Sequence, residues 1–319
     1  MLIRFWGTRG SLPVSLDAAG VRGKVKQALA AAAGRGFASD AELERFMDEE
    51  LEFTIAHTWG GSSPCVEIEG GEDGYVLCDM GSGLRAFGQR LTERGGLAHP
   101  DTFHVFMSHV HWDHIMGFPL FAPAYVPGNR IRIYGCHDIL EMALRRQHSE
   151  PCFPVAFDQL ASDIEFIRLD PDAVHEIAGF RISILRQDHS GDSFSYRFER
   201  DGASAVYSTD AEHRLQEASQ TERVVEFYRD ADLVIFDSMY SLADASSVKE
   251  DWGHSSNVVG VDLCHRARVK HLCLFHHEPL QNDEAIHRVW RETVRYEELM
   301  RQEHALVVSS AWDGMEIPL

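Results

Sequence analysis

Short apolar runs recur along the 319-residue chain, and most are bounded by glycine, aspartate, asparagine or proline. Runs of this length between turn-forming residues predict β-strands. They occupy residues 66–68, 75–78, 104–107, 130–134, 164–169, 180–185, 205–208, 233–236 and 271–275, and a similar run covers residues 1–6.

Apolar residues at three- and four-residue steps predict helices between some of these strands. This spacing covers residues 84–93, 139–148, 256–268 and 284–300. The strands come in clusters, the helices are intermittent, and no internal repeat is visible. Such an order predicts an α+β fold in one domain, residues 1–319: an αββα four-layer sandwich with two packed sheets and helices outside.

Residues 15–57 interrupt this pattern as an N-terminal helical insertion. An alanine-rich stretch covers residues 21–33, and Ser39 followed by Glu42 predicts a capping box at the start of a second helix. The insertion is either a helical hairpin on the outside of the sheets, a lid over the functional site, or a dimer contact.

Charge and composition narrow the function. The formal net charge of -20 disfavours extended nucleic acid as a partner, but not a small anionic substrate, because bound metal ions reverse the field locally. The six cysteines form no C-x-x-C pair, which predicts buried free thiols. We expect a cytoplasmic protein with no membrane span, because no uncharged apolar run is long enough and the first residues do not resemble a signal peptide.

The sequence His-Val-His-Trp-Asp-His at residues 109–114 carries the clearest chemistry. It follows an apolar run, and alternate residues of an extended chain lie on one face, so that His109 and His111 can bind one metal ion. Asp113 and His114 can reach a second ion. Imidazole and carboxylate ligands suit zinc at catalytic sites, although manganese and iron are also accepted.

Three further polar residues each follow an apolar, strand-like run, where the chain enters a loop. They are His189, Asp210 and His276. Since functional side chains concentrate on loops held by a rigid scaffold, these residues are candidates for the remaining ligands.

The order of these residues resembles the signature motifs of the metallo-β-lactamase superfamily of metal-dependent hydrolases. The matching residues are Asp79, His109, His111, Asp113, His114, His189, Asp210 and His276. The resemblance implies two divalent ions. The first is held by His109, His111 and His189. The second is held by Asp113, His114 and His276. Asp210 bridges the two ions, and Asp79 supports the ligands.

Gly253-His254-Ser255-Ser256 resembles an element of the phosphodiesterase branch of this superfamily, which includes ribonuclease Z and cyclic-phosphate phosphodiesterases. Two features depart from that branch: Ser62 stands where an asparagine is usual, and the insertion is longer. The aspartate at position 210, where the common dizinc lactamases have cysteine, disfavours β-lactam hydrolysis.

We therefore expect hydrolysis of a small phosphodiester, such as a cyclic one, or of a nucleotide by a hydroxide between the metal ions. Asp113 and Asp210 would orient the nucleophile, and His254 would donate a hydrogen bond or proton. Glu212 and His213 are candidate supporting residues.

The alternatives are ribonuclease Z-like RNA processing, hydrolysis of an ester, thioester or lactone, and a non-catalytic metal sensor. The expected partner is a small phosphodiester. The sequence leaves the oligomeric state open, and a homodimer is the assembly we expect because symmetric dimers are the commonest oligomers.

Overall fold

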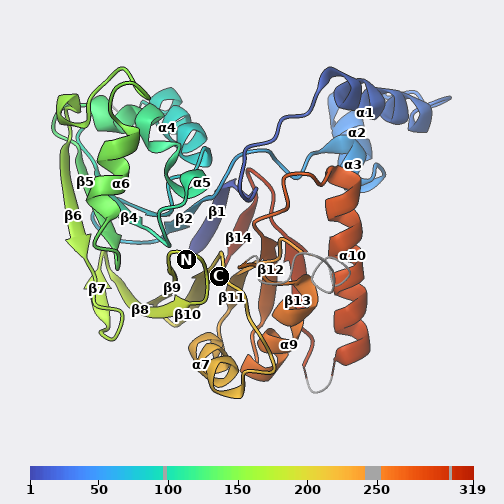
Figure 1. Cartoon of the computed structure of the whole chain (residues 1–319). Helices are drawn as coiled ribbons and strands as arrows, with labels where there is room; N and C mark the ends of the chain where they lie inside the picture. The colour runs from blue at the N-terminus through green and yellow to red at the C-terminus, as the bar shows by residue number, and fades with distance from the viewer. Residues whose placement is uncertain (96–98, 241–252, 302–303) are drawn as a thin grey trace.

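The computed structural model describes residues 1–95, 99–240, 253–301 and 304–319. Two seven-stranded sheets pack face to face (Figure 1). The first sheet has the order β14-β1-β2-β3-β4-β5-β6. Its strands are β1 (Leu2–Gly7), β2 (Cys65–Glu69), β3 (Tyr75–Cys78), β4 (Thr102–Phe106), β5 (Arg130–Gly135), β6 (Asp163–Arg168) and β14 (Glu316–Pro318).

The second sheet has the order β13-β12-β11-β10-β9-β8-β7. Its strands are β7 (His175–Ile177), β8 (Phe180–Gln187), β9 (Ser193–Arg200), β10 (Ala203–Ser208), β11 (Leu233–Asp237), β12 (His271–Phe275) and β13 (Val307–Ser310). In both sheets the central strands run parallel: β3, β4 and β5 in the first, and β10, β11 and β12 in the second.

Helices cover the outer face of each sheet. The first sheet carries α4 (Gly83–Glu93), α5 (Trp112–Ile115) and α6 (Leu140–Gln147). The second carries α7 (Ala218–Tyr228), α9 (Asn257–Ala267) and α10 (Asp283–Met300). The predicted αββα sandwich is therefore confirmed. No helix among the described residues combines the length and the apolar character needed to cross a membrane.

The main core lies between the two sheets and consists of side chains from both. Phe5 of β1 and Phe275 of β12 are fully buried, with ring centroids 6.0 Å apart. Phe106 of β4 meets Phe198 of β9 edge to face at 5.2 Å. This shared core fixes the ends of the two sheets relative to each other.

Four strands were absent from the sequence-based prediction: β7, β9, β13 and β14. The clearest of them is β9, where buried Phe194, Tyr196 and Phe198 alternate with more polar residues. The prediction relied on continuous apolar runs and so missed this period-two pattern.

Residues 15–57 form a helical arm of three helices, α1 (Ala18–Ala31), α2 (Asp40–Glu49) and α3 (Phe53–Ala56), beyond the first turn of α10 (Figure 1). The Ser39 hydroxyl accepts a hydrogen bond from the Glu42 amide, and the Glu42 carboxylate accepts one from the amide of Ala38. The expected cap at Ser39 is thus present, with the reciprocal bond displaced by one residue.

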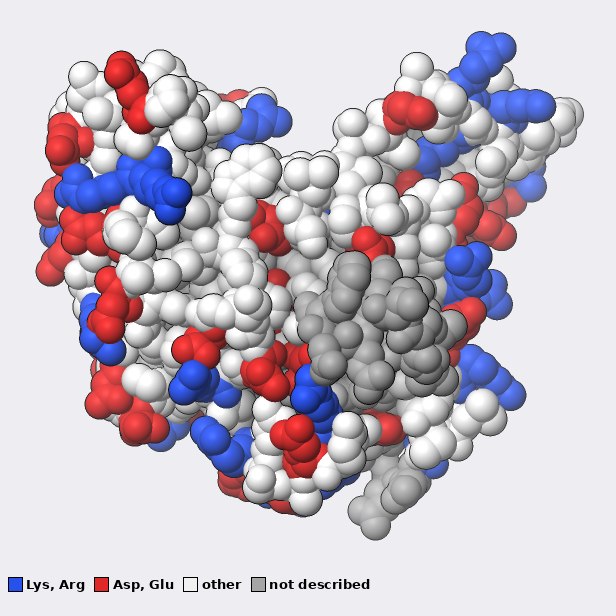
Figure 2. Space-filling model, in the orientation of Figure 1, with Lys and Arg blue, Asp and Glu red and all other residues white. Residues whose placement is uncertain are grey.

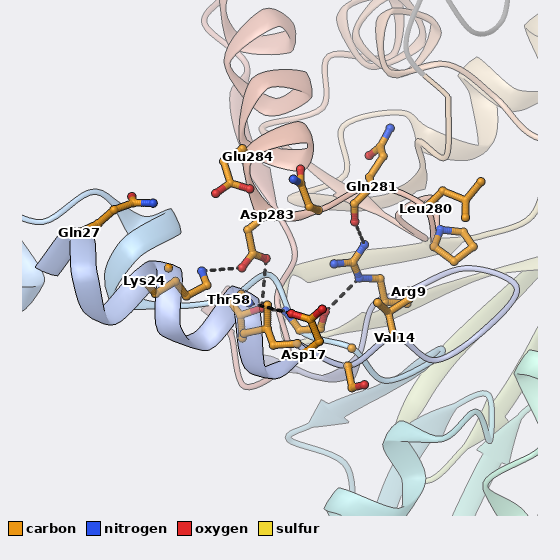
Figure 3. Close-up of a pocket in the computed structure, with 18 residues that line it drawn as sticks. Arg9, Val14, Asp17, Lys24, Gln27, Thr58, Leu280, Gln281, Asp283 and Glu284 are labelled. Atoms are coloured by element: carbon orange, nitrogen blue, oxygen red, sulfur yellow. Dashed lines mark hydrogen bonds and ion pairs between the residues drawn. The ribbon is translucent and has the colours of Figure 1, made fainter.

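An ion pair between a half-buried lysine and a buried aspartate attaches the arm to the body. Lys24 Nζ of α1 lies 2.6 Å from Asp283 Oδ2, and it also donates to the carbonyl oxygens of Thr54 and His57. Asp283 in turn accepts from the Trp59 amide at 2.9 Å. Figure 3 shows Lys24 and Asp283 facing each other across this junction. Because α1 itself contains no buried residue, this ion pair is a main link between α1 and the body.

Candidate metal centre

The ligand candidates lie at one edge of the sandwich, where the carboxyl ends of the parallel strands meet. The 109–114 motif follows β4 of the first sheet. In the second sheet His189 follows β8, Asp210 follows β10, and His276 follows β12. Ligands in sheets of this type usually bind beyond the carboxyl ends of the strands. Both sheets therefore contribute to one site.

Three residues of the site have left-handed backbone conformations: Asp79 (φ +60°), Asp210 (φ +45°) and His276 (φ +59°). Each directly follows, or nearly follows, a parallel strand. Such conformations cost of order 1–3 kcal/mol each and concentrate at functional sites.

The first cluster consists of His109, His111, His189 and Asp210, whose ligand atoms lie within 4.8 Å of one another. His189 Nε2 lies 3.1 Å from His111 Nδ1 and 3.7 Å from Asp210 Oδ2. His109 Nε2 lies 3.6 Å from the same carboxylate oxygen.

The second cluster consists of Asp113, His114, Asp210 and His276, and its four residues are all buried. His114 Nε2 lies 3.4 Å from His276 Nε2 and 3.2 Å from Asp210 Oδ1. Asp113 Oδ2 lies 3.3 Å from both imidazole nitrogens. Asp210 thus offers one carboxylate oxygen to each cluster.

The donor atoms fit divalent cations. With metal–nitrogen and metal–oxygen bonds of about 2.0–2.1 Å, neighbouring ligands of a tetrahedral ion are roughly 3.3 Å apart, which matches the measured separations of 3.1–3.7 Å. Moreover, the buried Nε2 of His109 has no hydrogen-bond partner. An unpartnered buried nitrogen is costly unless a ligand satisfies it.

Electrostatics also suit metal binding. Burial lowers the pKa of His109, His111 and His189, which favours neutral imidazoles with a free lone pair. Burial raises the pKa of Asp113 and Asp210, but the surrounding imidazoles outweigh it and hold both well below the usual range. Both groups are thus carboxylates.

Asp79 fixes the orientation of His114 in the second cluster. It is fully buried, and its Oδ2 accepts hydrogen bonds from His114 Nδ1 and from the Tyr207 hydroxyl, each at 2.7 Å. The Ser108 amide and hydroxyl donate to the same carboxylate. Because the Nδ1 proton of His114 is committed to Asp79, Nε2 of that ring is free to bind metal.

Gly253 orients the first cluster. The Nδ1 of His189 donates to the Gly253 carbonyl at 2.7 Å, which leaves its Nε2 facing the other ligand candidates of the first cluster. The Glu212 carboxylate accepts a hydrogen bond from the Gly253 amide at 3.3 Å. Glu212 therefore contacts Gly253, which orients His189, and does not contact His189 through this bond. His213 is half-buried and stacks on Phe236.

The sequence analysis missed Asp237, which ends β11. Its Oδ2 lies 2.7 Å from His254 Nδ1, and its Oδ1 lies 3.9 Å from His276 Nδ1. The His254 ring lies 5.1 Å from both the His189 and the His276 rings, between the two clusters. A polar residue directly after the apolar run 233–236 is the same signal that identified Asp210, and it identifies Asp237 equally well.

The chain segment after β1 closes one side of the centre. The Ser11 amide donates to Asp113 Oδ2 at 2.8 Å. A Cβ atom on Gly10 would lie 2.5 Å from His276 Nδ1, so only glycine fits there. Ser62 holds this segment through its backbone, because its carbonyl accepts from the amides of Thr8 and Arg9.

Residues 75–277 match the sequence profile of the beta-lactamase superfamily domain, and the chain belongs to that family. The resemblance identified from the sequence is thereby confirmed. The chain is a metal-dependent hydrolase with the metallo-β-lactamase fold, a fold that implies divalent metal ions.

Several known proteins are similar. Ribonuclease Z of Thermoplasma acidophilum is 22% identical over 281 residues, which cover 73% of this chain and 88% of that protein. The metallo-beta-lactamase fold protein YhfI of Bacillus subtilis superimposes with a TM-score of 0.63 at 17% identity, covering 99% of this chain and 98% of YhfI. A diphosphatase of the PhnP family gives a TM-score of 0.60 at 17% identity, covering 100% and 97%. These structural likenesses establish the fold.

Proposed function

We propose that the protein is a phosphodiesterase that acts on small phosphodiesters and binds two divalent cations, one in each cluster. The observation that carries this proposal is the Asp237–His254 pair between the clusters. When bound, the cations would supply positive charge for the phosphoryl oxygens and lower the pKa of a water molecule. Zinc suits the ligand set, and manganese or iron would also be accepted.

His254 is the proposed proton donor. Burial lowers its pKa, but the Asp237 carboxylate outweighs this effect and raises it to about 9. Asp237 holds Nδ1, so Nε2 is the nitrogen available to a substrate. A protonated imidazole there can donate to a phosphoryl oxygen or protonate the departing alkoxide, help that is typically worth about 10²–10⁴-fold in rate.

Asp113 and Asp210 have the second proposed role. Asp210 belongs to both clusters and Asp113 to the second, and their ionised carboxylates can accept a hydrogen bond from an attacking water molecule, which orients it toward phosphorus. The Ser11 amide restricts Asp113 to one orientation.

The first test is hydrolysis of bis(p-nitrophenyl) phosphate by purified protein, with metal content measured on the same sample. Asp210→Ala should abolish turnover and reduce bound metal. His254→Gln should lower kcat by about 10²-fold or more while metal content stays unchanged, and His175→Gln, at a half-buried histidine of β7 away from the site, is the matched control. Full metal occupancy without turnover would contradict the proposal.

RNA processing is a second candidate, favoured by the similarity to ribonuclease Z. One observation on the arm supports it: α1 carries Arg22, Lys24 and Lys26 and no acidic residue. Cleavage of a precursor tRNA 3′ end, reduced by Arg22→Ser with Lys26→Ser while bis(p-nitrophenyl) phosphate turnover is retained, would favour this candidate. The net charge of -20 favours the small substrate.

The homodimer also stays a prediction. On α1, Val21, Val25 and Leu29 lie at four-residue steps and are exposed, which favours the arm as a contact between copies over a lid. Light scattering on Val25→Glu tests this expectation: a dimer should become a monomer.

A further inference from the structure

An apolar cavity of about 920 Å³ lies beside the metal-ligand motif, between α5, the short 3₁₀ helix at Phe118–Leu120, and α6. Its size is in the range of cavities that bind small molecules. Eleven of its lining residues have apolar side chains: Pro13, Val110, Trp112, Ile115, Met116, Pro119, Leu120, Ile139, Met142, Ala143 and Phe153. The cavity therefore suits an apolar group larger than a methyl ester.

Several of these side chains are more exposed than is usual for large apolar residues. Trp112 is 61% exposed, Leu120 60% and Met142 56%. A contiguous patch of exposed apolar side chains on a protein surface is typical of a binding site. Figure 2 shows a hollow between the lobe that carries α4, α5 and α6 and the helical arm, and its walls are mostly uncharged.

The cavity and the metal centre share the same chain segments. Trp112 stands between the ligand candidates His111 and Asp113 and lines the cavity. Pro13 lines it too, two residues after Ser11, whose amide donates to Asp113. A substrate with its phosphate at the clusters could therefore place one ester group in the cavity.

Two arginines give the cavity its charge. Arg85 and Arg146 line it, and neither forms an ion pair or side-chain hydrogen bond within the described ranges. The preceding residue on α6 differs from Arg146 in this respect, since Arg145 forms ion pairs with Glu141 and Asp158. In a chain of net charge -20, unpaired guanidinium groups beside an apolar cavity complement an anion that carries an apolar group.

We infer that this cavity is the substrate-selectivity site, and that the substrate is an anionic phosphodiester with one bulky apolar ester group, aromatic or alkyl. The inference rests on the proposed phosphodiesterase function. The apolar wall would bind the ester group, and the two arginines would attract the anion. Each methylene buried in the cavity should strengthen binding by about fourfold.

The test uses phosphinates, anions whose P–C bonds cannot be hydrolysed, so that binding is measured separately from turnover. Calorimetry on the metal-loaded protein compares dimethylphosphinate with hexyl(methyl)phosphinate. The hexyl compound should bind at least ~30-fold more tightly, allowing for incomplete burial of its five additional methylenes. Phenyl(methyl)phosphinate distinguishes an aromatic from an alkyl group.

Surface variants locate the effect. Leu120→Gln and Met142→Gln, which add a polar group without a charge, should each reduce the preference for the hexyl compound by about tenfold and leave dimethylphosphinate binding unchanged. Val174→Gln, at an exposed valine outside the cavity, is the control. Arg146→Gln should weaken both phosphinates at low salt, whereas Arg145→Gln, which removes a paired charge from the adjacent position, should have little effect.

The outcomes separate the inference from the function on which it rests. Equal affinity for the dimethyl and hexyl compounds, or a hexyl preference unaffected by Leu120→Gln and Met142→Gln, overturns the inference. A hexyl preference that the variants remove supports it. If that preference is present but p-nitrophenyl hexyl phosphate is not hydrolysed, the cavity assignment stands and the phosphodiesterase proposal fails.

Discussion

Replacing Asp79 with asparagine tests how the second cluster is held. The carboxylate accepts hydrogen bonds from His114 Nδ1, the Tyr207 hydroxyl, and both the amide and hydroxyl of Ser108. Asparagine keeps the shape but turns one of the two acceptor oxygens into a donor. At least one of the buried donors then loses its partner, and His114 loses the anion that fixes its tautomer.

The magnitude follows from these contacts. Loss of a carboxylate that orients a metal-bound histidine typically costs 10–100-fold in metal affinity. An unpaired buried donor adds about 1–3 kcal/mol of destabilisation to the fold. We therefore expect Asp79→Asn to weaken one metal site by about 10–100-fold and to lower the melting temperature, while the other site is largely retained.

Competition with a chromophoric chelator gives the two metal dissociation constants separately. Tyr207→Phe is the matched comparison, because it removes one hydrogen bond to Asp79 but leaves the bond to His114 in place. It should change metal affinity less than Asp79→Asn does. Equal loss from both sites, or an unchanged affinity in Asp79→Asn, would refute the assignment of Asp79 to His114.

Other predictions concern the metal, the arm and the segment after β1. Removing metal by dialysis against a chelator should lower the melting temperature, since the clustered carboxylates lose their counter-charge, and zinc should restore it; an unchanged temperature would speak against bound metal. Lys24→Met should raise the rate of amide hydrogen exchange in α1 by about tenfold or more, because buried Asp283 loses its cation. Lys26→Met should not, and equal effects of the two changes would contradict the role of the Lys24–Asp283 ion pair in attaching the arm. Gly10→Ala should reduce metal affinity, because its Cβ would overlap His276; unchanged affinity would show that the segment can move away.

Much of the fold could be predicted from the sequence, because continuous apolar runs bounded by turn residues mark buried parallel strands. The run at 271–275 corresponds to β12 in full. The alternating strand β9 was missed, since one polar residue between each pair of aromatic residues hides a strand from a search for continuous runs.

The candidate ligands could be located because their side chains follow strands whose carboxyl ends meet. Local sequence could not show which nitrogen of each imidazole faces the cluster. The ring of His189 is oriented by the carbonyl of Gly253, which is 64 residues away in sequence. Nor could it show that Glu212 contacts Gly253 and that His213 packs on Phe236, because only the tertiary fold determines these neighbours.

The alternation along residues 109–113 has a consequence for how the enzyme can change. Histidines and an aspartate at odd positions face the clusters, while Val110 and Trp112 at even positions line the cavity. One short segment thus contributes candidate metal ligands on one side and part of the cavity wall on the other. Substitutions at the even positions should retune which esters are accepted without disturbing the ligands, which makes Trp112 the natural position for redesigning the substrate range.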